Sequence, residues 1–103
     1  MGLVFLSAWG VMMIEFEWDA NKARVNLLKH AVSFDEAKTV FDDPLYVDFY
    51  DPDHSDDEDR YIIIRRSQQG RLLFVSYAEG RNRTRLISAR EATRREKAAY
   101  EEG

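Results

Sequence analysis

The sequence predicts an α+β domain in which one mostly antiparallel β-sheet is flanked by helices, in the order β-α-α-β-β-β-β-α. Residues 14–18 alternate between apolar and acidic, which is typical of a half-buried strand. Two helix-capping signals follow, Asp19 and then Ser33 with Glu36 three positions later. Four apolar or alternating runs separated by turn residues fill the region 45–87, and a basic segment closes the chain.

The length and composition of the chain fit a small folded domain without disulfides. A chain of 103 residues with 45% hydrophobic residues is large enough for one folded domain with a modest core. The absence of cysteine excludes disulfides and thiolate metal sites and agrees with a reducing compartment, so we expect a cytoplasmic protein.

The first twelve residues are apolar and uncharged. They are too short to span a bilayer and lack the positive start of a secretory signal, so we expect no membrane association. Because Met13 opens a cleaner domain sequence, we interpret 1–12 as an upstream extension outside the core and 13–103 as a single domain. An added strand or a membrane-contacting tail are the alternatives.

Two helices are expected after the first strand. Asp19 is expected to cap a helix over 20–30, with Val25, Leu28 and Asn21 turned inward. The second helix, 34–41, presents apolar residues at the spacing of one buried face and ends before Pro44, since proline disfavours helix in the residue before it. Its predicted buried residues are Phe34, Ala37, Val40 and Phe41.

The following strands are separated by polar turns. Residues 45–50 are predicted as an edge strand, and 61–64 and 72–77 as central strands. Residues 51–59 form a loop rich in carboxylates, and residues 67–70 fit the turn of a hairpin.

The basic segment 81–97 is the main functional candidate. Alternation places Arg81, Arg83 and Arg85 on one strand face. Ser88 and Glu91 have the spacing of a capping box, which predicts a helix with Arg90 in its first turn and Arg90, Arg94 and Lys97 along one side. The segment is interpreted as a phosphate or RNA-backbone site, and the alternative is a solvated basic edge paired with glutamates.

The charge distribution supports a localised basic site. Residues 15–59 contain fourteen acidic and four basic residues, whereas 60–97 contain three acidic and eleven basic ones. With a net charge of −4, the chain is not expected to coat nucleic acid indiscriminately.

Two further groups of residues are candidates for chemistry. Lys29 and His30 end the first helix, where cations are also favoured simply by the helix dipole. His54 and Glu58 are candidates for a proton-transfer pair within the carboxylate loop.

The carboxylate loop 51–59 does not match the calcium-loop template, because the glycine and glutamate positions counted from Asp51 hold Asp56 and Ile62. A magnesium site or a purely solvated loop are the alternatives.

The chain contains no phosphate-binding glycine loop, nucleophile elbow or zinc-ligand spacing, so no metal or cofactor is expected. Cleavage of RNA is a reaction that needs neither a metal nor a cofactor, because the 2′-OH of the substrate is itself a nucleophile. The protein then has to position the RNA, accept one proton and stabilise charge at phosphorus, for which arginine is well suited.

The chain resembles the BrnT family of ribonuclease toxins of type II toxin–antitoxin systems from Met13 to Glu102. The resemblance is carried by short motifs in matching order: Phe16-Glu17-Trp18-Asp19, Lys22, Asn26-Leu27, Lys29-His30, Val32-Ser33-Phe34, Glu36-Ala37, Val40-Phe41, Asp43-Pro44, His54-Ser55, Glu58, Arg60, Arg71-Leu72-Leu73, Ile87-Ser88-Ala89-Arg90, Ala92-Thr93 and Glu96.

The resemblance implies a RelE-like fold and a metal-independent endoribonuclease that lowers translation and arrests growth. It also implies neutralisation by a cognate antitoxin whose ribbon-helix-helix part binds operator DNA, so that DNA is contacted only through the antitoxin. A homodimer is compatible with this picture.

Site roles follow from the resemblance together with the residue chemistry. Arg90 is expected to be the main phosphate-stabilising residue, with Lys29 and His30 next. His54, Glu58 and Arg60 are expected to transfer or orient protons, and Arg83, Arg85 and Arg94 to contact RNA. Two alternatives stay open, a nucleic-acid-binding module without catalysis and a protein-interaction domain.

Overall fold

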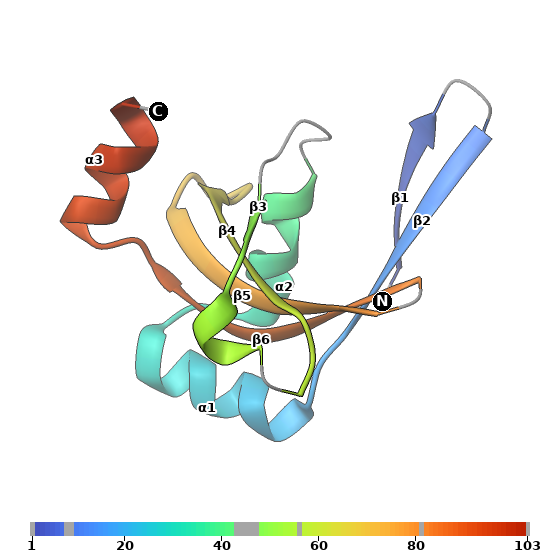
Figure 1. The fold of residues 1–103 in the computed structure, drawn as a ribbon, viewed down its shortest axis with the longest axis horizontal. Coiled ribbons are helices and arrows are strands. Elements are labelled where there is room, and N and C mark those ends of the chain that lie inside the picture. The colour runs from blue at the N-terminus through green and yellow to red at the C-terminus, as the bar shows by residue number, and fades with distance from the viewer. Residues whose placement is uncertain (1, 8–9, 43–47, 56, 81, 103) are drawn as a thin grey trace.

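A six-stranded sheet with the order β1-β2-β6-β5-β4-β3 organises the chain (Figure 1). The computed structural model describes residues 2–7, 10–42, 48–55, 57–80 and 82–102. β2 and β6 are parallel, and the other neighbouring strands are antiparallel. The strands are β1 (Gly2–Ser7), β2 (Gly10–Glu17), β3 (Asp48–Tyr50), β4 (Arg60–Arg66), β5 (Leu72–Gly80) and β6 (Arg83–Glu91).

The helices divide between the two faces of the sheet. α1 (Ala20–His30), α2 (Phe34–Ala37) and the 3₁₀ helix η1 (Lys38–Phe41) pack on the inner face. α3 (Arg94–Glu102) stands at one end of the opposite, outer face, and the short 3₁₀ helix η2 (Pro52–His54) lies between β3 and β4. No helix in the described ranges is long and apolar enough to cross a membrane.

The predicted fold class and element order are confirmed, with one strand more than expected. The backbone of β1 pairs with β2 from Gly2 to Ser7, as in the added-strand alternative for residues 1–12. The expectation that this segment is an extension outside the core stays a prediction. Of the predicted strand 45–50, Asp48–Tyr50 forms β3, and the remainder lies outside the described residues.

The capping signals place the first two helices correctly. The carboxylate of Asp19 accepts from the Lys22 amide at 2.9 Å, and the Ser33 hydroxyl accepts from the Glu36 amide at 3.0 Å. α1 ends where Ala31 takes up a left-handed conformation with φ of 58°. The segment 34–41 is helical throughout but tightens from α into 3₁₀ geometry at Lys38, and its four predicted apolar residues are buried.

The prediction that a helix begins at Ser88 was wrong. β6 continues to Glu91 because β5 provides a full-length partner, and Ala89 is completely buried on the inner face. The helix begins instead with a capping box at Thr93, whose hydroxyl accepts from the Glu96 amide at 3.1 Å, while the Glu96 carboxylate accepts from the Thr93 amide at 2.9 Å. Arg90 is therefore a strand residue and shares no helical stripe with Arg94 and Lys97.

The predicted inward face of α1 was also wrong. Val25 is 44% exposed, Leu28 is 77% exposed and Asn21 is exposed as well, while Asn26 is buried. The reason lies in the sheet, since β2 pairs with β6 only from Arg83 to Arg85 and leaves the edge of β6 open beyond that point. The Asn26 amide nitrogen donates to the Ala89 carbonyl at 2.8 Å, and its oxygen accepts from the Ala89 amide at 3.1 Å. This side chain thus takes the place of a strand partner.

The core lies between the inner face and α1, α2 and η1. Its aromatic centre contains Phe16 from β2, Phe41 from η1 and Tyr77 from β5, with ring centroids 5.1 Å and 5.0 Å apart for the two successive pairs. Aliphatic side chains from the central strands complete it: Ile63, Leu73, Val75 and Leu86.

An ion pair between buried Glu36 and half-buried Arg71 joins α2 to the β4–β5 hairpin. Glu36 is 4% exposed, and its carboxylate accepts from the Arg71 Nε at 3.0 Å and the Ser67 hydroxyl at 2.7 Å. The hydrogen bond from Arg71 holds the pKa of Glu36 below its ordinary value, against the opposing effect of burial. The ionised pair therefore fixes the hairpin against the helical layer.

Replacing Asn26 by alanine is expected to lower the free energy of unfolding by about 3 kcal/mol, because the amide and carbonyl of Ala89 lose their partners inside the protein. Urea unfolding followed by circular dichroism measures this loss. The matched control is Asn21→Ala on the exposed side of α1. Equal stability of the two variants would show that Asn26 does not secure α1.

Glu36→Gln is expected to cost about 3 kcal/mol at pH 7, because it leaves Arg71 without its ionised partner. Since folding lowers the pKa of Glu36, the pair stabilises the protein fully above the ordinary value of 4.5 and loses this contribution as the pH falls through the folded pKa. Thermal melts from pH 7 to pH 3 should therefore show a smaller fall in Tm for the variant than for the wild type, that is, a flatter acid limb of the curve of Tm against pH. Asp35→Asn, at an exposed neighbouring carboxylate, should leave the limb unchanged.

Candidate active site

The outer face presents three cross-strand rows from β4, β5 and β6. The strand register gives the rows as Arg60–Ala78–Arg85, Ile62–Ser76–Ser88 and Ile64–Phe74–Arg90. A bulge in β6 opposite Ser76 and Tyr77 inserts Ile87, which keeps Arg85 and Arg90 on the same face although they are five residues apart. The structure therefore brings a cation from β4 and two from β6 to one surface.

Glu58 draws the two arginines of the first row together. Its Oε2 accepts from Arg60 Nη2 at 3.4 Å and from Arg85 Nη2 in a close ion pair. Ala78 between them carries only a methyl group, so both guanidinium groups have room to converge. The hydrogen bond from Arg85 lowers the pKa of Glu58, with a smaller contribution from the charge of Arg60.

The guanidinium of Arg60 is only partly used by these contacts. Its Nε is buried and has no hydrogen-bond partner among the described residues. Buried donors are normally satisfied, so this unpaired Nε–H is an exception within the protein, and contact with a ligand falls to the partly exposed Nη groups of Arg60.

His54 lies beside this pair and is oriented by Asp51. The Nδ1 of His54 and the Oδ2 of Asp51 are 2.9 Å apart. An ionised carboxylate can only accept, so Nδ1 carries the proton and Nε2 is left as the basic atom. Asp51 is held in turn by the Asp53 amide, while His54 is largely exposed. A hollow of about 220 Å³ lies between the two groups, and His54, Glu58 and Arg60 line it together with the carboxylates of Asp53 and Asp57.

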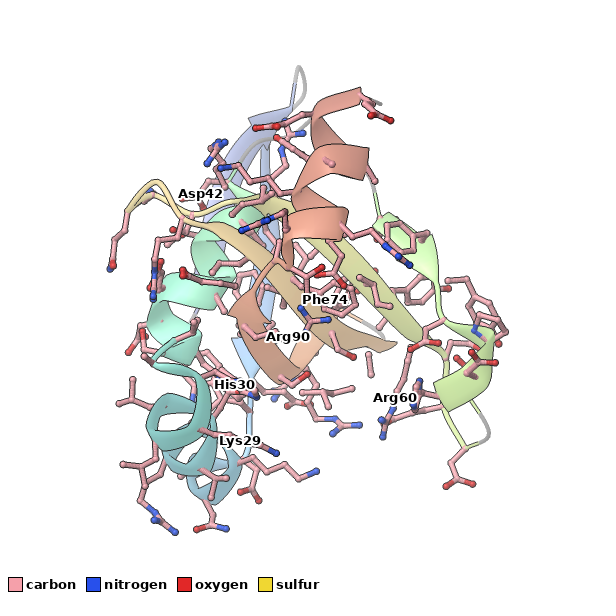
Figure 2. The ribbon with its side chains drawn as sticks, turned by 90° about the vertical axis from the view of Figure 1, so that its left-hand side faces the viewer. Lys29, His30, Asp42, Arg60, Phe74 and Arg90 are labelled. Carbon is pink, nitrogen blue, oxygen red and sulfur yellow. The ribbon has the colours of Figure 1, made fainter. Side chains whose placement is uncertain are left out.

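Arg90 occupies the centre of the outer face, on the ring of Phe74 (Figure 2). Its guanidinium carbon lies 4.1 Å from the Phe74 ring centroid. Nη1 and Nη2 donate to the two oxygens of Glu96 at 2.8 Å and 3.0 Å, and Nη1 also donates to the Glu91 carbonyl. This bidentate contact raises the pKa of Arg90 and lowers that of Glu96.

The contacts of Arg90 leave one edge of its guanidinium open. Arginine has five N–H donors, and the described contacts use three of them. The remaining Nε–H and Nη2–H lie along the same edge, in the geometry that suits two oxygens of a phosphate. Glu96 and Phe74 therefore hold Arg90 in place and leave this edge of its guanidinium without a partner among the described residues.

Lys29 and His30 lie at the flank of the outer face, opposite Arg60 (Figure 2). Asn26 ties α1 to Ala89, so the residues one turn later in the helix come close to β6. Lys29 and His30 line a shallow groove of about 240 Å³ together with Ile87 and Lys22. No carboxylate belongs to its lining, and among the described residues neither lysine has an ion-pair partner.

The two remaining predicted RNA contacts are more peripheral. Arg83 begins β6 and pairs with Glu15 at 3.7 Å and Glu17 at 3.0 Å, both from β2. Arg94 is exposed at the start of α3. Arg81 lies outside the described residues.

The structure places His54, Glu58 and Arg60 around one hollow, but the predicted pair of His54 with Glu58 is not found among the described contacts, because His54 pairs with Asp51 and Glu58 with the two arginines. The sequence-based predictions gave no role to Asp51 or Phe74. Asp51 was treated only as part of an acidic loop, although its spacing of three from His54 suits a local hydrogen bond. The stacking of Phe74 under Arg90 and the bridge from Glu58 to Arg85 depend on strand register, for which the sequence carries no direct signal.

The chain is similar in fold to the 1.1 Å crystal structure of the Brucella abortus ribonuclease toxin BrnT, with a TM-score of 0.59 and 18% sequence identity over 79% of this chain and 99% of that one. No curated protein matches the sequence at a significant level. Residues 18–96 match the family described as the ribonuclease toxin BrnT of type II toxin–antitoxin systems. Because this match spans most of the chain, the protein belongs to the BrnT family of ribonuclease toxins.

Proposed function

We propose that this ribonuclease toxin cleaves RNA without a bound metal ion, at the outer face of its sheet. The observation that carries the proposal is the pair of arginines joined by Glu58 beside the Asp51–His54 pair. It combines a proton acceptor with fixed positive charge on one surface, which are the two protein functions needed when the 2′-OH of the substrate is the nucleophile.

In this mechanism the Nε2 of His54 accepts the proton of a ribose 2′-OH. The 2′-oxygen bonds to phosphorus, and the bond from phosphorus to the 5′-oxygen breaks, giving a 2′,3′-cyclic phosphate and a 5′-hydroxyl end. Asp51 stabilises the imidazolium that forms, as carboxylates do for catalytic histidines. Arg60 and Arg85 stabilise the charge that develops on the phosphoryl oxygens, and permanently charged guanidinium groups need no metal for this task.

The departing 5′-oxygen takes up a proton on the side opposite the attacking oxygen. His30, on the flank opposite Arg60 (Figure 2), is the proposed general acid because it is the other of the two histidines in the chain. The open edge of Arg90 binds a phosphate on the row formed by Ile64, Phe74 and Arg90, and Lys29 binds the next phosphate along the RNA strand. Arg83 and Arg94 contact RNA only where a longer strand extends past the sheet.

The biological consequences follow from the family. Type II toxin–antitoxin systems pair a toxin with an antitoxin, and an RNA substrate is implied by the ribonuclease description. We propose that cleavage occurs in the cytoplasm, lowers translation and arrests growth. We also propose that the cognate antitoxin neutralises the toxin and that its ribbon-helix-helix part alone contacts operator DNA.

Purified protein is expected to cleave single-stranded RNA in the presence of EDTA, and Arg85→Ala is expected to lower the rate about 100-fold, because one of the groups that stabilise charge at phosphorus is removed. Cleavage of a labelled oligonucleotide measures both effects. Arg95→Ala, which removes an exposed charge from α3, is the control and should keep the wild-type rate.

Intact RNA in EDTA together with restored cleavage on adding a divalent cation would contradict metal independence. Binding of RNA without cleavage in either condition would favour the non-catalytic binding module instead, with an affinity that falls steeply with salt.

His54→Gln is expected to lower the cleavage rate at least 100-fold while leaving RNA affinity nearly unchanged, because the change removes the proton acceptor and no phosphate contact. Asp51→Asn should produce a smaller loss, since the imidazole keeps its place but loses the charge that stabilises its protonated form. Single-turnover rates and separate binding measurements distinguish the two effects. A fully active His54→Gln variant would remove His54 from the mechanism.

A further inference from the structure

An apolar groove lies between α3 and the β3–β4 end of the outer face. Its volume is about 670 Å³, and it is lined by Phe49 and Ile64 from the strands and by Ala99 and Tyr100 from the helix. α3 forms one wall without burying any of its own residues, so the groove is not closed by packing. The mechanism described above makes no use of this space.

Phe49 is the most conspicuous residue of the groove. It pairs in register with Ile62 and therefore projects from the outer face, where it stays 49% exposed. Its neighbour Tyr50 is equally exposed but pairs with Tyr61 on the opposite face, where the two rings meet edge to face at 5.7 Å. No aromatic partner of this kind is found for Phe49 within the described part of the chain.

The groove adjoins the proposed phosphate contact at Arg90. Glu96 lines the groove and also holds the guanidinium of Arg90 at 2.8 Å. Ile64, at the base of the groove, belongs to the same cross-strand row as Arg90, two strand spacings or roughly 10 Å away. One nucleotide, with a sugar between its phosphate and base, can reach from one to the other.

The groove carries charges of both signs. Its carboxylates are engaged by arginines, since Arg90 binds both oxygens of Glu96 and Arg66 pairs with Glu101 at 3.9 Å. Arg65 also lines the groove, and Arg90 lies on the same cross-strand row as Ile64. Cations beside exposed aromatic side chains are the arrangement by which proteins bind single-stranded nucleic acid.

We propose that this groove is a subsite for one unpaired RNA base, which stacks against Phe49 while the adjoining phosphate lies at Arg90. The proposal rests on the proposed ribonuclease function and adds to it a contact that selects single-stranded over paired RNA, because a paired base cannot enter the groove.

The test compares binding of a non-cleavable 2′-fluoro hexanucleotide with that of a series in which each position in turn is abasic. The wild type is expected to bind at least one abasic member roughly tenfold more weakly than the parent, the size of a lost stacking contact. In Phe49→Leu, which keeps apolar bulk but removes the ring, this difference should fall to about twofold. Tyr50→Leu, the adjacent aromatic on the opposite face, is the control and should keep the full difference. Thermal melts establish that both variants are folded.

Each outcome decides between the subsite and its alternatives. Equal binding of all abasic members by the wild type overturns the base subsite while leaving RNA binding itself intact. If Phe49→Leu keeps the tenfold difference but weakens binding of the antitoxin, the base subsite is also overturned, and the groove is a binding site for the antitoxin. Absence of any RNA binding at low salt overturns the proposed function, and the subsite with it.

Discussion

The backbone of Ala89 depends for its hydrogen bonds on a side chain from a helix, because the neighbouring strand ends too early to supply them. β2 covers only three residues of β6, and Asn26 satisfies both the amide and the carbonyl of Ala89 beyond that point. One side chain thus completes a sheet edge and fixes α1 against it. As a result, His30 one turn later in α1 and Arg90 one residue later in β6 border the same face of the protein.

Carboxylates hold the arginines of this protein in place and limit their mutual repulsion. Glu58 joins Arg60 and Arg85, while Glu96 secures Arg90 on the ring of Phe74. Arg90 still keeps an Nε–H and an Nη2–H that Glu96 does not use. In a chain with a net charge of −4, this pairing leaves a localised basic site rather than a surface that attracts any polyanion.

Much of the fold was predictable because its signals are local. Caps at Asp19 and Ser33, and apolar runs such as 61–64, depend on residues within one turn or one strand. The last helix was placed too early because Ser88–Glu91 and Thr93–Glu96 have the same spacing, and only the length of β5 shows that the strand continues through the first pair. The exposed face of α1 could not be foreseen, since it depends on where β2 ends.

The candidate site, too, was predictable only where its residues lie close together in the sequence. His54, Glu58 and Arg60 lie within seven positions of one another, so their proximity follows from the chain itself. The addition of Arg85 requires the pairing of β4, β5 and β6 and the bulge at Ile87, which no local pattern reveals. Arg90 was identified for its charge and its place in a basic segment, yet the way it is held, on Phe74 and by Glu96, is a tertiary property.

The central claim is that RNA is bound on the outer face by the arginines of β4 and β6. Nuclear magnetic resonance of the guanidinium Nε–Hε groups during titration with the non-cleavable 2′-fluoro hexanucleotide tests it most directly. The account predicts that the signals of Arg60, Arg85 and Arg90 shift together and saturate at one RNA per protein, while that of Arg71, committed to Glu36 on the other side of the sheet, stays in place. Shifts confined to other arginines, with these three unchanged, would contradict it.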